Sequence, residues 1–118
     1  MRDARDWIGV DFDRTLAEYQ SGWASDDKVG EPIMPMVRRV QEWLRNGYQV
    51  KIFTARVASI KKQERVESNR KLIQDWCLKH IGQVLEVTAE KDHWCREIWD
   101  DIAVGLVPNT GVRADGRD

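Results

Sequence analysis

The chain has few cysteines and no long apolar run, and each lack excludes a class of protein. Its two cysteines, Cys77 and Cys95, make neither a disulfide framework nor a close metal-binding pair. Reduced thiols are typical of a cytoplasmic protein, which is the location that we expect. No apolar stretch approaches the ~20 residues that a membrane helix needs. Charged residues between Arg2 and Asp6 interrupt the place where the apolar part of a secretory signal would lie.

An excess of charge of one sign is missing as well. The 118 residues carry 19 lysines and arginines against 20 aspartates and glutamates, a formal net charge of −1. This balance argues against binding nucleic acid through bulk electrostatic attraction, although a local basic patch is compatible with it. With 42% hydrophobic and 33% charged residues and no internal repeat, the composition is that of one globular domain. We expect this domain over residues 1–107 and a loose polar tail over residues 108–118.

Apolar runs and apolar stripes alternate along the chain. The strands expected from short apolar runs cover residues 7–13, 48–54, 84–88, 98–101 and 103–107. The helices expected from apolar residues at helical spacing cover residues 36–44 and 66–81. Strands that alternate with helices in this way form a parallel sheet with helices packed on its faces. The predicted fold is a three-layer, Rossmann-like α/β domain with a central parallel sheet.

Polar side chains lie at the ends of three of these strands and shortly after a fourth. They are Asp11, Asp13, Thr54, Lys91, Asp100 and Asp101. The carboxyl ends of parallel strands meet at one edge of the sheet, which is where open α/β sheets bind ligands. Crowded carboxylates raise one another's pKa unless a divalent cation neutralises them, and their hard oxygen atoms suit Mg²⁺. A carboxylate can also attack phosphorus, while a hydroxyl and an ammonium group hold the phosphoryl oxygens.

These residues resemble the motifs of the haloacid dehalogenase superfamily, in its phosphatase branch. The run Asp11-Phe12-Asp13-Arg14-Thr15-Leu16 is similar to the first motif, and Thr54-Ala55-Arg56 is similar to the second. Lys91 resembles the third motif, and Asp100-Asp101 resembles the acidic fourth. The motifs occur in order over roughly residues 6–107. The resemblance implies a Mg²⁺-dependent phosphomonoester hydrolase that works through an aspartyl-phosphate.

The resemblance also implies a role for each residue. Asp11 would take the phosphoryl group, and Asp13 would protonate the leaving oxygen and then activate water. Lys91 would offset negative charge on the nucleophile and the phosphate. The residues implied to bind substrate are Thr54, Ala55, Arg56 and Lys91. The residues implied at the metal are Asp11, Asp13 through its backbone carbonyl, Asp101 and Asp100. Asp101 is our choice for the direct ligand over Asp100, and the sequence leaves that order open.

Two features depart from the family pattern. Arg14 stands where the first motif usually has glycine, which adopts a positive φ at little cost. The intervals 16–35 and 54–84 are too short for the cap domain that the family commonly inserts. An open site admits a large substrate, such as a phosphorylated nucleic-acid end, or is covered by a neighbouring subunit of a homo-oligomer.

The substrate is not readable from these residues, and nucleotides, sugar phosphates and 3′-phosphate ends all remain open. We favour a nucleotide or polynucleotide phosphate because Arg14, Trp23 and Arg56 could serve such a ligand. Each has a plainer interpretation. Arg14 would be solvated at the surface, Trp23 would anchor its loop, and Arg56 would pair with a nearby acid.

Two other functions fit parts of the pattern. A receiver-like domain keeps its aspartyl-phosphate as a switch, but no aspartate precedes Thr54 or Thr88 to accept the phosphoryl group after a later strand. The second carboxylate, two residues after Asp11, also favours rapid dephosphorylation, which a switch would avoid. A non-catalytic module that retains the fold for binding is the other alternative, and the complete set of acids argues against it.

Overall fold

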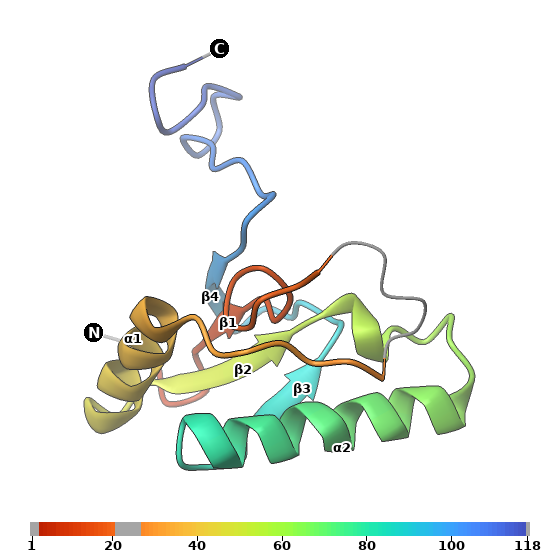
Figure 1. The fold of residues 1–118 in the computed structure, drawn as a ribbon. Coiled ribbons are helices and arrows are strands. Elements are labelled where there is room, and N and C mark those ends of the chain that lie inside the picture. The colour runs from red at the N-terminus through yellow and green to blue at the C-terminus, as the bar shows by residue number, and fades with distance from the viewer. Residues whose placement is uncertain (1–2, 21–26, 118) are drawn as a thin grey trace.

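The computed structural model describes residues 3–20 and 27–117. Its strands and helices alternate along the chain, as Figure 1 shows. The strands are β1 (Trp7–Val10), β2 (Gln49–Phe53), β3 (Glu86–Thr88) and β4 (Cys95–Trp99). The helices are α1 (Met34–Arg45) and α2 (Gln63–His80), with a short 3-10 turn, η1 (Ala55–Val57), ahead of α2. None of the described helices has the length and apolar composition that crossing a membrane requires.

The four strands form one parallel sheet in the order β3-β2-β1-β4. Ile8 of β1 is paired with Val50 of β2 on one side and with Glu97 of β4 on the other. The outer pair of β2 and β3 is parallel too. The α/β class and the central parallel sheet that the sequence predicts are therefore confirmed. Because all four strands run the same way, the residues that follow them lie at one edge of the sheet.

Both helices pack on the same face of this sheet. Val50 and Ile52 of β2 point toward them and are buried. The core cluster on this face joins β1 and β2 to the apolar sides of both helices, which contribute Met36, Val37, Val40, Val66, Ile73, Trp76 and Cys77. Amphipathic stripes of this kind bury their apolar side against the sheet and leave the charged side in water. The predicted helices are confirmed, and each begins a few residues earlier than predicted.

The opposite face of the sheet is covered by the connection between β3 and β4. Phe53, which alternates with Ile52 along β2, faces this side and packs edge-on against Trp7 with ring centroids 6.4 Å apart. The Trp7 indole Nε1 donates to Asp92 of the connection at 2.8 Å. The third layer is thus an extended connection, and it brings residues 89–94 back across the sheet from the end of β3 to the start of β4.

The chain after β4 differs from what the sequence predicts. β4 ends at Trp99, so Asp100 and Asp101 follow the strand. The expected strand over residues 103–107 is wrong, because within the described ranges this segment joins no strand of the sheet and makes only an isolated bridge from Leu106 to Arg113. A strand is held by the backbone of a neighbouring strand, and this segment leaves the sheet (blue in Figure 1). The expected domain boundary at residue 107 stays a prediction.

Candidate functional site

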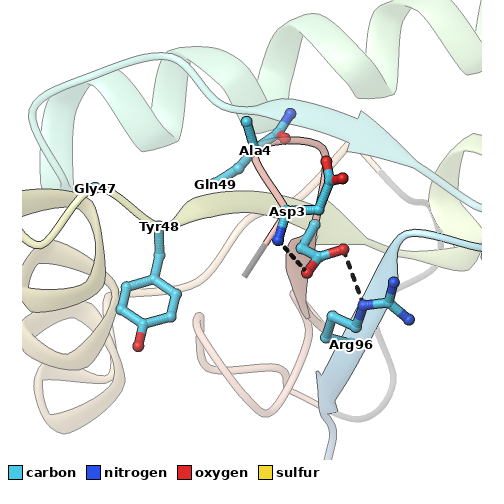
Figure 2. Close-up of a pocket in the computed structure, with 7 residues that line it drawn as sticks. Asp3, Ala4, Gly47, Tyr48, Gln49 and Arg96 are labelled. Atoms are coloured by element: carbon cyan, nitrogen blue, oxygen red, sulfur yellow. Dashed lines mark hydrogen bonds and ion pairs between the residues drawn. The ribbon is translucent and has the colours of Figure 1, made fainter. Parts of the chain in front are cut away.

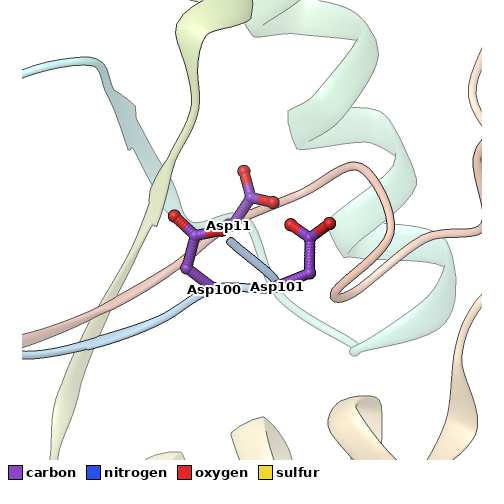
Figure 3. Close-up of side chains that lie close together, drawn as sticks. All are labelled: Asp11, Asp100 and Asp101. Atoms are coloured by element: carbon purple, nitrogen blue, oxygen red, sulfur yellow. The ribbon is translucent and has the colours of Figure 1, made fainter. Parts of the chain in front are cut away.

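Three carboxylates meet where β1 and β4 end. Asp11, Asp100 and Asp101 each offer an oxygen atom, and these atoms all lie within 4.8 Å of one another. Figure 3 shows the three side chains gathered at the ends of these neighbouring strands. The Asp11 amide donates to the Trp99 carbonyl at 2.9 Å, which fixes the end of β1 beside the residue that precedes Asp100. The parallel pairing of two strands therefore brings residues 89 positions apart in the sequence into one cluster.

The carboxyl group of Asp11 is perturbed by this arrangement. Its pKa is raised from 3.8 to about 7, first by partial burial and then by the negative charges of Asp100 and Asp101. Hydrogen bonds from the Phe12 amide and the Thr15 hydroxyl lower the pKa, but they are outweighed. Strongly perturbed acids cluster at functional sites, so Asp11 is the candidate reactive group of this cluster.

A tight turn separates Asp11 from Asp13 and sends the chain back under the sheet edge. Phe12 is fully buried against Trp76, with ring centroids 5.1 Å apart, and its carbonyl accepts from the amides of Leu16 and Ala17 at 2.9 Å. Arg14 adopts φ 69°, which is left-handed backbone that glycine favours. The backbone of the turn thus has the conformation that a glycine would adopt at this position. Arg14 is strained there, because its Cβ crowds a left-handed backbone.

Asp13 is held by Arg56 from the turn after β2. The guanidinium donates from Nε to Oδ2 and from Nη2 to Oδ1, both at 2.8 Å. The side chain of Arg56 is 7% exposed and that of Asp13 is 24% exposed. Of the two interpretations of Arg56 from the sequence, substrate binding or pairing with an acid, the structure shows the pairing. A two-point contact of this kind fixes the orientation of the carboxylate as well as its position.

The other predicted residues take different places. Thr54 is 5% exposed, and its Oγ1 accepts from the Arg56 amide at 3.1 Å, so it caps η1. Ala55 is exposed at the start of the same turn. Lys91 is exposed in the β3–β4 connection. Burial raises the pKa of the nearby Cys95 thiol, and the positive charge of Lys91 opposes that rise. Across the described ranges, no hydrogen bond or ion pair joins Lys91 to the three acids, and its role there stays a prediction.

Two residues support the site without having been assigned a role from the sequence. Thr15 donates from Oγ1 to Asp11 Oδ2 at 3.3 Å and is 9% exposed. Asn69 is 3% exposed, and its Nδ2 donates to the Arg56 carbonyl at 3.0 Å. The available signal for Asn69 was its spacing, because it lies on the same side of the helix as Val66 and Ile73. A polar residue on an apolar stripe needs a partner, and that partner is the backbone of the site.

Trp23, expected to stack on a base or to anchor its loop, lies outside the described residues.

A separate cavity of about 760 Å³ lies at the opposite end of the strands from the three acids, where β1, β2 and β4 begin (Figure 2). It is lined in part by Tyr48 and Arg96. The buried carboxylate of Asp6 accepts there from Arg96 Nε at 2.9 Å and from the Asp3 amide at 3.0 Å. These groups hold the chain that enters β1.

Comparisons with known proteins give a fold and no activity. No protein-family model matches the chain. No curated protein matches it either. A solved structure described as a conserved protein coded by a locus from Bacteroides thetaiotaomicron is similar to it, with 18% sequence identity and a TM-score of 0.53. The match covers 86% of this chain and 80% of that chain. At this identity the likeness shows the α/β fold alone.

Proposed function

We propose that the protein is a Mg²⁺-dependent phosphomonoester hydrolase of the haloacid dehalogenase type, with Asp11 as its nucleophile. The observation that carries the proposal is the meeting of Asp11, Asp100 and Asp101 within 4.8 Å at the carboxyl edge of the sheet. The order of the motifs along the chain supports it. The arrangement of the first two aspartates on a tight turn supports it as well, since Arg14 there adopts the backbone of the usual glycine.

The chemistry of the three acids fits a divalent cation. Crowding and partial burial raise the pKa of Asp11, and a cation among the carboxylates would reverse that effect by stabilising their charged forms. Mg²⁺ prefers hard oxygen ligands and takes a few carboxylates together with substrate phosphate. Asp11, Asp100 and Asp101 would hold it, with the Asp13 carbonyl beside them. When bound, the ion would offset the negative charge of the phosphate and the acids.

The reaction follows from the two aspartates of the turn. The ionised Asp11 carboxylate attacks phosphorus, and the bond from phosphorus to the leaving oxygen breaks as Asp13 delivers a proton to that oxygen. A water molecule then attacks the phosphorus of the aspartyl-phosphate and gives a proton to Asp13. Phosphate leaves and Asp11 returns as a carboxylate. The Asp11 hydrogen bond from Thr15 orients the nucleophile throughout.

The turn after β2 would bind the phosphoryl group. Thr54 carries a hydroxyl that can donate as well as accept, and Ala55 is exposed beside it. Both carboxylate oxygens of Asp13 are engaged by Arg56, so the acid and base role of Asp13 requires Arg56 to release one of them. Lys91 is proposed as the charge-neutralising group and would reach the site from the β3–β4 connection.

The substrate that we favour is a nucleotide or a phosphorylated nucleic-acid end. The intervals 16–35 and 54–84 are too short for a cap domain over the acids, and an uncovered site suits a bulky phosphomonoester better than a small one. A panel of nucleoside monophosphates, 3′-phosphorylated oligonucleotides and sugar phosphates would test this preference. Equal turnover of all three would remove its basis.

The test of the activity is hydrolysis of p-nitrophenyl phosphate by the purified chain in Mg²⁺ or EDTA. We expect turnover in Mg²⁺ that EDTA abolishes, and a fall by a factor of about 10³ or more in Asp11→Asn, because the amide is no nucleophile. The matched control is Asp75→Asn, which removes an exposed carboxylate that pairs with Lys71 on α2. Full activity in Asp11→Asn would contradict the assignment. Turnover of neither p-nitrophenyl phosphate nor any member of the substrate panel would favour the non-catalytic binding module.

A further inference from the structure

The chain beyond β4 projects away from the rest of the protein, as the blue segment of Figure 1 shows. We name residues 102–117 the C-terminal arm. Its middle is a small hairpin in which the Val107 amide donates to the Val112 carbonyl at 2.8 Å and the Ala114 amide donates to the Gly105 carbonyl at 2.9 Å. Every residue of the arm except Arg113 is exposed. The arm is therefore ordered by its own backbone and buries almost nothing.

The exposed side chains of the arm are largely aliphatic. Ile102 is 77% exposed, and Val104, Leu106, Val107 and Val112 are between 42% and 55% exposed. An isolated two-stranded hairpin has only marginal stability in water. Apolar side chains that gather on the surface of a monomeric protein often mark a site of interaction. Covering these five side chains would stabilise the hairpin and remove them from water. The arm thus has the composition of an interface segment.

The edge of β4 is a second unused surface beside the arm. β4 is the last strand in the order β3-β2-β1-β4 and pairs with β1 on one side. Within the described ranges, no strand pairs with its other side. The free edge of a strand presents N–H and C=O groups that pair readily with another extended segment. The run Ala103–Val107, which the sequence predicts to be a strand, is such a segment.

The arm does not reach this edge within its own chain. Asp100 and Asp101 alone separate β4 from the arm, and a parallel return would need a dozen or more residues. An antiparallel return would use these two aspartates as a hairpin turn. The structure instead holds their carboxylates beside Asp11, and the Ile102 amide donates to Asp100 Oδ1 at 3.1 Å as the chain leads away. The free edge and the arm stay apart.

We propose that the arm docks on a second copy of this chain, where residues 103–107 pair along the free edge of β4. One copy offers one arm and one edge, so a two-fold dimer satisfies both in both copies and closes on itself. The arm begins three residues after β4, so a reciprocal exchange needs no linker. The net charge of −1 causes little repulsion between copies. This inference does not depend on the proposed hydrolase activity.

The first experiment is sedimentation velocity of the full chain over about a hundredfold range of concentration. We expect a species with twice the 13.8 kDa mass of the chain, and a shift to the single mass in Leu106→Lys. The matched control is Ile60→Lys, because Ile60 is 94% exposed before α2 and lies outside the arm. It should keep the doubled mass. A wild-type chain that stays monomeric over the whole range would overturn the proposal and leave the arm for a different protein.

The second experiment tests the backbone pairing. Val104→Pro removes an amide that pairing with β4 would use, whereas Val104→Thr keeps the amide and the β-branched shape. We expect the doubled mass in the threonine variant and the single mass in the proline variant, with an unchanged far-UV circular dichroism spectrum in both. A dimer that survives both Val104→Pro and Leu106→Lys would overturn the role of the arm. Asp11→Asn should dimerise normally, which separates this result from the fate of the hydrolase proposal.

Discussion

Arg56 and Asp13 join the turn after β2 to the turn after β1 through two hydrogen bonds of 2.8 Å. The backbone amide and the backbone carbonyl of Arg56 are both hydrogen-bonded to side chains. Its amide donates to Thr54 Oγ1, and its carbonyl accepts from Asn69 of α2. Three segments that are distant in the sequence, the turn after β1, the turn after β2 and helix α2, therefore fix one carboxylate at the edge of the acid cluster. This ion pair fixes the orientation of the second aspartate.

We expect Arg56→Lys to lower both stability and activity. Lysine keeps the charge but cannot make the two-point contact, so part of a half-buried carboxylate is left unsatisfied. The free energy of unfolding should fall by about 1–3 kcal/mol in urea titrations, and kcat for p-nitrophenyl phosphate should fall more than KM rises. The control is Arg45→Lys in the exposed pair with Glu42, which should change stability by less than about 0.5 kcal/mol. An equal change in the two variants would contradict the structural role of the Arg56 pair.

Much of the site could be predicted from the sequence. Apolar runs show roughly where strands end, and the carboxyl ends of parallel strands lie at the same edge of the sheet. Asp11 and the pair Asp100-Asp101 come together for that reason. The direction of Arg56 could not be predicted, since a long side chain in a turn reaches either substrate or a neighbouring acid, and local sequence favours neither. The missing partner of residues 103–107 was equally unreadable. A short apolar run predicts a strand, but the strand exists only where tertiary structure supplies its neighbour.

Arg14 is strained, and relieving that strain should stabilise the protein. At φ 69° a glycine has no Cβ to crowd the backbone, so Arg14→Gly should raise the free energy of unfolding by about 0.5–1 kcal/mol. The substitution also removes the guanidinium from its place over the Tyr19 ring, 5.5 Å from the ring centroid. Such an interaction is worth little at an exposed site. Urea titrations with an unchanged slope would measure the gain.

The control for Arg14→Gly is a glycine placed in ordinary helical backbone. Arg38 is exposed on α1, and Arg38→Gly should lower the free energy of unfolding by about 1 kcal/mol. Opposite signs for the two substitutions would show that backbone conformation decides the effect. Destabilisation by Arg14→Gly would instead mean that the arginine side chain stabilises the turn by more than its strain.

Gly30 is required by a close approach of two backbones next to the site turn. A Cβ atom at this position would lie 1.8 Å from the Glu18 carbonyl oxygen, and the Gly30 carbonyl also accepts from Trp76 Nε1 at 2.9 Å. Gly30→Ala should therefore lower the free energy of unfolding by more than about 2 kcal/mol, because backbone has to move. Gly105→Ala is the control, since its nearest contact would be an ordinary 3.7 Å to Ala114. Similar thermal stability of the two variants would contradict the close approach.

The raised pKa of Asp11 makes the stability of the metal-free protein depend on pH. Asp11 loses its proton near pH 3.8 in the unfolded chain and near pH 7 in the folded one. Between these values the folded state holds more protons, so its stability falls as pH rises. The contribution of the protonated Asp11 is complete below pH 3.8 and is lost as pH passes through about 7.

Asp11→Asn should remove this loss, because asparagine does not ionise. In EDTA, the variant should gain on the wild type as pH rises from 4 to 8, by about 1–2 kcal/mol once solvent screening of the half-buried group is allowed for. Mg²⁺ should then raise the melting temperature of the wild type at pH 8, since it stabilises the ionised acids, and should raise that of Asp11→Asn less. Thermal unfolding at several pH values with and without Mg²⁺ measures both effects. If the stabilities of the two proteins instead changed with pH in parallel from pH 4 to 8, Asp11 would have the same pKa in the folded protein as in the unfolded chain. That result would contradict the raised pKa of Asp11.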